Sequence, residues 1–230
     1  MAKLKAILGR AHGFLSAHPV LVRAAVKLRN QANSVVTTYF SKLSISSDSR
    51  ANGEYMLAEH VAPDSQNFVD VGANEGEWSA HFLRHMRQPG PGLLYEPGIA
   101  CVGRLKRRFA GNQALVVRNV ALADWNGTTD LFESTDDTRL SSMSADNAVT
   151  AIIHAVQVAT LDQEMGERGW ERLSFLKIDA EGHDFFVSRG ARGLLKRRGI
   201  DILQFERKST WNATGITLRG PVNFLAEFGY

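Results

Sequence analysis

The chain has 230 residues, which is enough for one domain with a sizeable hydrophobic core, and 44% hydrophobic with 22% charged residues is ordinary for a globular protein. The only cysteine, Cys101, excludes an intramolecular disulfide and favours a reducing compartment, so we expect a cytoplasmic protein. A net charge of +3 is too small to indicate a nucleic-acid partner, and one cysteine with scattered histidines gives no zinc-site spacing.

The first 47 residues contain no Asp or Glu and are basic. Their apolar residues recur at roughly helical spacings with a break at Pro19, so we expect a basic helical extension over 1–50, followed by a domain over 51–230. No apolar run there is long enough to span a bilayer. Helices packed on the domain edge are the favoured interpretation. A peripheral helix attracted to anionic lipid and an organelle transit peptide are the alternatives.

Within the domain, strands alternate with helices. A short helix is predicted toward His60, and the stretch 67–76, N-F-V-D-V-G-A-N-E-G, predicts a buried strand followed by a glycine turn. Further strands are expected over 92–97, 114–122, 128–133, 156–161, 174–178 and 200–205, and helices over 77–86, 101–109, 185–198 and 218–228. This order predicts an α/β fold with a doubly wound, mostly parallel sheet. The polar loop over 135–147, with Ser141 and Ser142, is either a lid or a surface loop.

Ligands of such a sheet bind beyond the carboxyl ends of the strands. The predicted strand ends carry polar or acidic residues, namely Asp70, Glu96, Asn119, Asp179 with Glu181, and Glu206. We therefore expect a site along this edge of the sheet. Asp184, which follows closely, is expected to be a helix N-cap or a solvated loop charge.

The glycine turn suits a nucleotide-like ligand, because Gly72 and Gly76 allow a close backbone approach and the helix start offers free N–H groups. Glu96 follows about twenty residues later, where an acid commonly holds a ribose diol. The spacing departs from the G-x-G-x-x-G of nicotinamide-binding folds, and the Asp70 carboxylate suits an amino group. S-adenosylmethionine is therefore favoured over NAD, while a tight turn without a ligand is the alternative for the turn alone.

The runs F-V-D-V-G-A-N-E-G, L-Y-E-P, N-V-A-L-A-D-W-N-G and L-K-I-D-A-E-G-H-D resemble the FkbM family of S-adenosylmethionine-dependent methyltransferases, from about Asn52 to the C-terminus. The resemblance implies a Rossmann-like class I methyltransferase fold and O-methylation of a hydroxyl on a sugar, glycan, glycolipid or polyketide-type acceptor. This fold normally continues into closing strands beyond the position of Tyr230, so we expect that either the sequence is truncated or the protein lacks the usual final antiparallel pair.

The resemblance also implies roles for individual residues. Asp70, Gly72, Asn74 and Gly76 would hold the methionine part of the cofactor, Glu96 its ribose, Asn119 and Val120 its adenine, and Glu54 its amino end. The candidate catalytic residues Asp179, Glu181 and His183 would face the acceptor, with His183 the candidate base by side-chain type.

Three alternatives stay open. Asp179, Glu181 and Glu206 could hold a divalent cation such as Mg²⁺, although no metal site is indicated. The chain could instead be a non-catalytic nucleotide-binding or assembly module, or an NAD-dependent oxidoreductase.

Overall fold

The computed structural model describes residues 52–134, 151–207 and 216–230, together with positions 18, 20, 49, 50, 141, 142 and 211. The chain divides into two compact units, Met1–Glu54 and Tyr55–Tyr230, and the fold described below belongs to the second. The expected basic helical extension and most of the loop over 135–147 lie outside the described residues, and the division at residue 50 stays a prediction.

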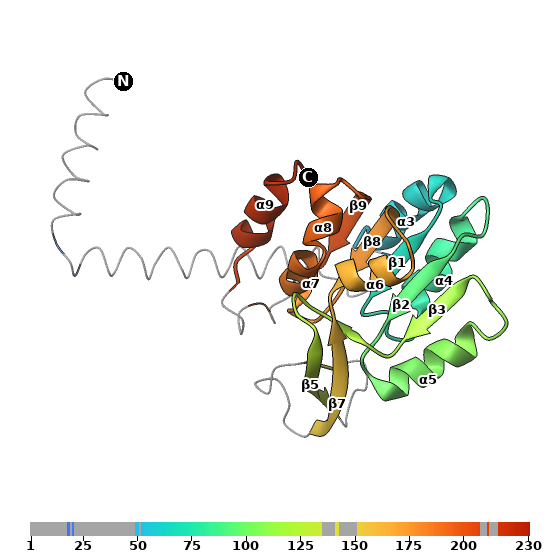
Figure 1. Ribbon diagram of the computed structural model, residues 1–230, viewed down its shortest axis with the longest axis horizontal. Helices are drawn as coiled ribbons and strands as arrows, with labels where there is room; N and C mark the ends of the chain where they lie inside the picture. The colour runs from blue at the N-terminus through green and yellow to red at the C-terminus, as the bar shows by residue number, and fades with distance from the viewer. Residues whose placement is uncertain are drawn as a thin grey trace. The chain divides into compact units, whose positions relative to one another are not determined.

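The main sheet has five strands in the order β3-β2-β1-β8-β9, and every neighbouring pair is parallel (Figure 1). Its strands are β1 (Phe68–Val71), β2 (Gly92–Tyr95), β3 (Leu115–Arg118), β8 (Leu173–Ile178) and β9 (Ile200–Phe205). This confirms the predicted doubly wound α/β fold. The order of the strands reverses between β1 and β8, which is where ligands bind in open α/β sheets.

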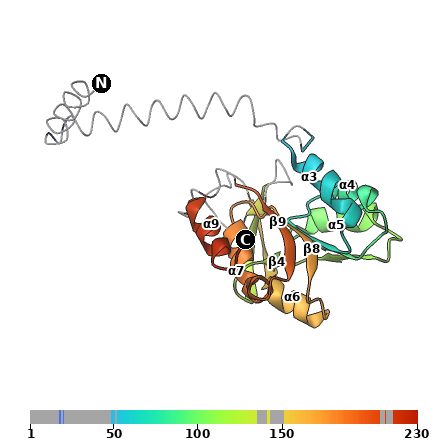
Figure 2. The ribbon, with the colours of Figure 1, turned by 90° about the horizontal axis from the view of Figure 1, so that it is seen from above.

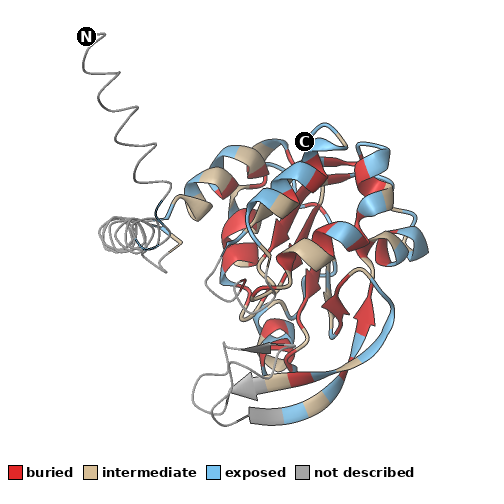
Figure 3. Cartoon of the chain, turned by 90° about the vertical axis from the view of Figure 1, so that its left-hand side faces the viewer, coloured by how far each residue is buried: buried red, intermediate tan, exposed pale blue. Residues whose placement is uncertain are grey.

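Helices cover both faces of this sheet (Figures 1 and 2). One face carries α3 (Glu54–Val61) with the short η1 (Ala62–Asp64), α4 (Glu77–His85) and α5 (Ile99–Arg108), and the other carries α6 (Leu161–Glu167), α7 (Asp184–Gly190), α8 (Arg192–Lys196) and α9 (Arg219–Ala226). Strand alternation sends Phe68 into an aromatic core beneath α4 and Val69 into an aliphatic core on the other side. Buried strands therefore lie between helices whose outer surfaces are exposed (Figure 3).

A second sheet, which the sequence did not predict, has the order β4-β7-β5-β6. It comprises β4 (Ala121–Leu122), β5 (Gly127–Ser134), β6 (Ser141–Ser142) and β7 (Ala151–Ala159). The prediction of one strand over 114–122 was therefore wrong, because β3 and β4 belong to different sheets. The break falls at Asn119, whose side-chain amide donates to the carbonyl oxygens of Glu96 and Pro97 at 3.1 and 2.8 Å.

The helices also differ from the prediction in two places. The expected helix over 185–198 is divided at Ala191, and the Asp162 carboxylate accepts hydrogen bonds from the first N–H groups beyond the break, those of Gly193 and Leu194. The helix α6 was missed, although Thr160 caps it by accepting from the N–H of Gln163, three residues on. That Thr-x-x-Gln spacing is a sequence signal for a helix start.

Asp184 is not the N-cap that the sequence predicted. His183 occupies that position, and Asp184 lies inside the first turn of α7. Its buried carboxylate accepts hydrogen bonds from the N–H groups of Ala180 and Gly182 and from Nε1 of Trp211. Asp184 therefore fixes the turn between β8 and α7 from within the core.

A bilayer-crossing helix, which would need a long apolar run, is absent from the part of the chain that the structure describes.

Candidate functional site

A pocket opens at the carboxyl ends of β1, β2 and β8, beside the point where the strand order reverses. Its empty space, counted together with the open solvent at its mouth, is about 640 Å³. Its walls come from the turn after β1, the end of β2, the start of α5, strand β4 with Leu131 of β5, and the turn after β8. The pocket therefore lies at the carboxyl ends of the strands, where the sequence predicted a site.

The turn after β1 has a left-handed backbone at Gly72, Asn74 and Gly76, with φ of 76°, 49° and 77°. A Cβ at Gly72 would lie 1.9 Å from the carbonyl oxygen of Asp179, and one at Gly76 would lie 2.5 Å from the ring of Phe109. Both glycines are thus required by contacts within the protein itself. Gly72 and Asn74 line the pocket, whereas Gly76 begins α4 outside the lining.

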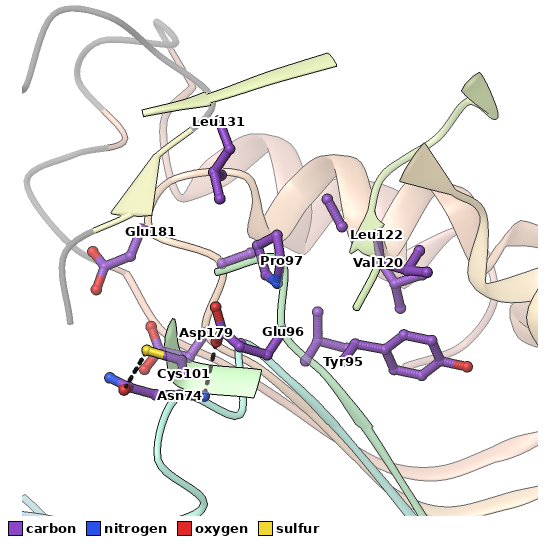
Figure 4. Close-up of a pocket in the computed structure, with 14 residues that line it drawn as sticks. Asn74, Tyr95, Glu96, Pro97, Cys101, Val120, Leu122, Leu131, Asp179 and Glu181 are labelled. Carbon is purple, nitrogen blue, oxygen red and sulfur yellow. Dashed lines mark hydrogen bonds between the residues drawn. The ribbon is translucent and has the colours of Figure 1, made fainter. Parts of the chain in front are cut away.

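Glu96 follows β2 and is the most constrained acid of the pocket, with 4% of its surface exposed. Its Oε2 accepts from the backbone N–H of Asn74 at 2.9 Å (Figure 4). Its Oε1 accepts from the backbone N–H of Gly98 at 2.8 Å. These bonds join the turns after β1 and β2. A carboxylate has about four acceptor positions, so capacity remains for the hydroxyls of a ligand.

The pocket has an apolar part and an acidic part (Figure 4). The apolar part is formed by Val120 and Leu122 of the β4 segment, together with Leu131 of β5. The acidic part is formed by Asp179 and Glu181, on the turn after β8. Asn119 is not among the lining residues, because its amide is bound to backbone carbonyl groups.

Asp70 lies beneath the pocket and does not line it. It is fully buried, accepts a hydrogen bond from Oγ of Ser79 at 2.6 Å, and lies 3.4 Å from Nζ of Lys177. Lys177 is opposite Asp70 across the β1–β8 pair, and its Nζ lies 3.8 Å from Oδ2 of Asp179. Lys177 therefore links Asp70 to Asp179, which lines the pocket.

Lys177 was missed in the sequence, although a lysine within the apolar run F-L-K-I signals a buried cation that needs a partner. Cys101 was missed as a lining residue too. Its thiol donates to Oδ1 of Asn74 at 3.4 Å, and it lies on the first turns of α5, where a lone cysteine carries no sequence signal for a site.

His183 follows the acidic turn and does not line the pocket. Burial lowers its pKa from the ordinary value of 6.5, so its imidazole is neutral at pH 7. Among the described residues its Nδ1 has no hydrogen-bond partner. His183 is therefore a partly buried, neutral imidazole that follows Glu181 by two residues in the chain.

The pocket thus brings together six of the residues that the sequence singled out, and these are Gly72, Asn74, Glu96, Val120, Asp179 and Glu181. Six others are not in its lining, and these are Glu54, Asp70, Gly76, Asn119, His183 and Glu206. Glu54 belongs to the first unit of the chain. The roles proposed for these residues stay predictions.

Comparison with known proteins gives one family match, to the Methyltransferase FkbM domain, over residues 70–230. No curated protein matches the chain. Among solved structures, the methyltransferase FkbM from Methylobacillus flagellatus KT is 15% identical with a TM-score of 0.43, and the match covers 74% of this chain and 47% of that one. The O-methyltransferase from Bacillus cereus in complex with SAH is 10% identical with a TM-score of 0.43, over 86% of this chain and 75% of that one. The chain thus spans about half the length of the Methylobacillus protein.

Proposed function

Since the chain belongs to the FkbM methyltransferase family, we propose that it uses S-adenosylmethionine to methylate a hydroxyl group of a sugar, glycan or glycolipid. Membership confirms the resemblance carried by the motifs around Asp70 and Asp179. The observation that carries the cofactor assignment is the buried, pocket-lining carboxylate of Glu96 at the end of β2.

The residues of the pocket fit this cofactor chemically. Glu96 is held by two backbone N–H groups and keeps acceptor capacity for the two hydroxyls of a ribose. Val120, Leu122 and Leu131 offer an apolar surface of the kind that suits an adenine ring. The left-handed turn at Gly72 and Asn74 exposes backbone next to the same pocket, and there it would meet the methionine part.

When bound, S-adenosylmethionine supplies an electrophilic methyl group on a sulfonium. The chain's own residues would then hold the acceptor hydroxyl in line and take up its proton. Asp179 and Glu181 line the pocket and can accept hydrogen bonds from acceptor hydroxyls. His183 is the candidate base by side-chain type, and Asp179 and Glu181 are the candidates by position, because they line the pocket and His183 does not.

Glu96→Gln tests the cofactor site, because it keeps the size of the side chain but replaces one acceptor oxygen by a donor. We expect calorimetric titration of the wild-type chain to show saturable binding of S-adenosylmethionine and no binding of NAD, and we expect the variant to bind at least tenfold more weakly. Equal affinities for the cofactor would refute the ribose assignment. Saturable binding of NAD alone would indicate an oxidoreductase.

The acceptor is tested separately with a labelled methyl donor and a panel of sugars, glycolipids and polyketide-type alcohols. We expect transfer to a sugar hydroxyl, and we expect Asp179→Ala and His183→Ala to reduce turnover while leaving cofactor affinity within a few fold. Transfer only to polyketide-type alcohols would overturn the choice of acceptor but not the choice of cofactor. Cofactor binding without transfer to any acceptor would indicate a non-catalytic module.

A further inference from the structure

A cluster of side chains that could ligate a metal ion lies outside the pocket, on the α3 and α4 side of the sheet. Glu59 of α3 and His81 and His85 of α4 each bring one ligand atom within 4.8 Å of the others. Read along the chain these histidines look scattered, but they are four residues apart on a helix and therefore share one face. None of the three lines the pocket, so the cluster is independent of the proposed methyl transfer.

The two imidazoles are held in place by their neighbours. The His81 side chain is only 9% exposed, and the ring of Tyr55 stacks on it with a centroid distance of 3.8 Å and an interplanar angle of 13°. Its Nε2 lies 3.0 Å from Oε1 of Glu59, without hydrogen-bond geometry. A nearly buried ring nitrogen thus lies next to a carboxylate on the neighbouring helix.

His85 has the arrangement that metal-ligating histidines commonly show. Its Nδ1 lies 2.9 Å from the backbone carbonyl oxygen of His81. Because a carbonyl oxygen only accepts hydrogen bonds, Nδ1 must carry the proton, and Nε2 then has a free lone pair. A hydrogen bond from one ring nitrogen to a carbonyl fixes the tautomer and the ring orientation of a metal ligand.

We propose that Glu59, His81 and His85 bind a Zn²⁺ ion that joins α3 to α4, with water in the fourth position. Two imidazole nitrogens and one carboxylate oxygen are a common zinc ligand set, whereas Mg²⁺ and Ca²⁺ prefer oxygen ligands. Bond lengths of about 2.0–2.1 Å would bring the ligand atoms of a tetrahedral site to about 3.4 Å apart. The required contraction is at most about 1.4 Å, and it falls on the distances to His85, because Nε2 of His81 and Oε1 of Glu59 are already 3.0 Å apart.

The hydrogen bond from Arg84 to His81 competes with zinc binding. The NH2 group of Arg84 lies 3.3 Å from Nδ1 of His81, and because a guanidinium only donates, Nδ1 is the acceptor there and the ring proton is on Nε2. Zinc on Nε2 requires that proton to move to Nδ1 and the guanidinium to leave. Arg84 is exposed on α4, so its side chain can rotate into solvent. Removal of Arg84 should therefore strengthen zinc binding, which a purely structural Glu59–His81 pair does not predict.

The test is calorimetric titration of the full, untagged and metal-stripped chain with ZnCl₂ and, separately, with MgCl₂. We expect saturable binding of one Zn²⁺ per chain and no binding of Mg²⁺. Glu59→Gln and His85→Ala should each weaken zinc binding at least tenfold, and Arg84→Ala should strengthen it several-fold. His60→Ala removes an exposed imidazole from the residue after Glu59 and is the matched control, with affinity expected to equal that of the wild type.

A thermal scan gives an independent readout, since an ion that binds only the folded state raises the midpoint of unfolding. Zinc should raise the midpoint of the wild type and of His60→Ala but not that of His85→Ala. His85 is only partly buried, so the midpoint of its variant without zinc reports whether the fold is kept. Zinc affinities that are equal in the wild type, Glu59→Gln and His85→Ala would overturn the proposal, as would the absence of saturable zinc binding to the wild type.

Discussion

The contact between the turns after β1 and β8 can be tested with one pair of glycine variants. Gly72 and Gly111 both have a left-handed backbone, with φ of 76° and 85°. A Cβ at Gly72 would lie 1.9 Å from the carbonyl oxygen of Asp179, whereas a Cβ at Gly111 would have no neighbour within 4 Å. Gly111→Ala therefore measures the backbone cost alone, and Gly72→Ala measures the backbone cost together with the steric clash.

The magnitudes follow from these two contributions. A left-handed conformation costs an L-residue about 1–2 kcal/mol, which is the whole loss expected for Gly111→Ala. Overpacking adds about 1–3 kcal/mol, so Gly72→Ala should lower the free energy of unfolding by about 2–5 kcal/mol. Each kcal/mol corresponds to about 2–4 °C in the thermal midpoint of a domain of this size. Equal midpoints for the two variants would refute the close approach of the two turns.

Two further predictions concern buried charges. Lys177→Met should lower the free energy of unfolding by about 3–5 kcal/mol, because it removes the cation beside the fully buried Asp70 carboxylate. Urea denaturation should show that the double variant with Asp70→Asn regains part of this loss. No regain would contradict a contribution of the pair to stability. Burial alone would raise the pKa of Glu164, but hydrogen bonds from Arg118 and Tyr95 and the charge of Arg168 hold it below its ordinary 4.5. The lowered pKa of Glu164 stabilises the fold above pH 4.5, and this stabilisation is lost as the pH falls through the folded-state pKa. In urea denaturation at decreasing pH, the free energy of unfolding should therefore fall more steeply for the wild type than for Glu164→Gln. Parallel curves for the two proteins would contradict this prediction.

Local patterns in the sequence were sufficient for much of the fold. The strands β1, β2, β8 and β9 were predicted within a few residues, because short apolar runs bounded by turn residues are typical of buried strands. Glu96 was predicted at the end of a strand for the same reason, and it does line the pocket. The division of 114–122 between two sheets could not be read from its apolar run, because the break depends on the Asn119 amide reaching carbonyl groups 22 and 23 residues away.

The sequence by itself therefore determined the strands β1, β2, β8 and β9, the family and the acidic edge of the sheet, because these follow from short motifs along the chain. The tertiary structure decided which of these acids face the pocket. Asp70 and Lys177 are 107 residues apart and become partners only through the register of β1 on β8. Glu59 likewise meets His81 only because α3 and α4 pack on the same side of the sheet. Distances of a few ångströms between remote residues are set by packing and strand register, which one sequence does not contain.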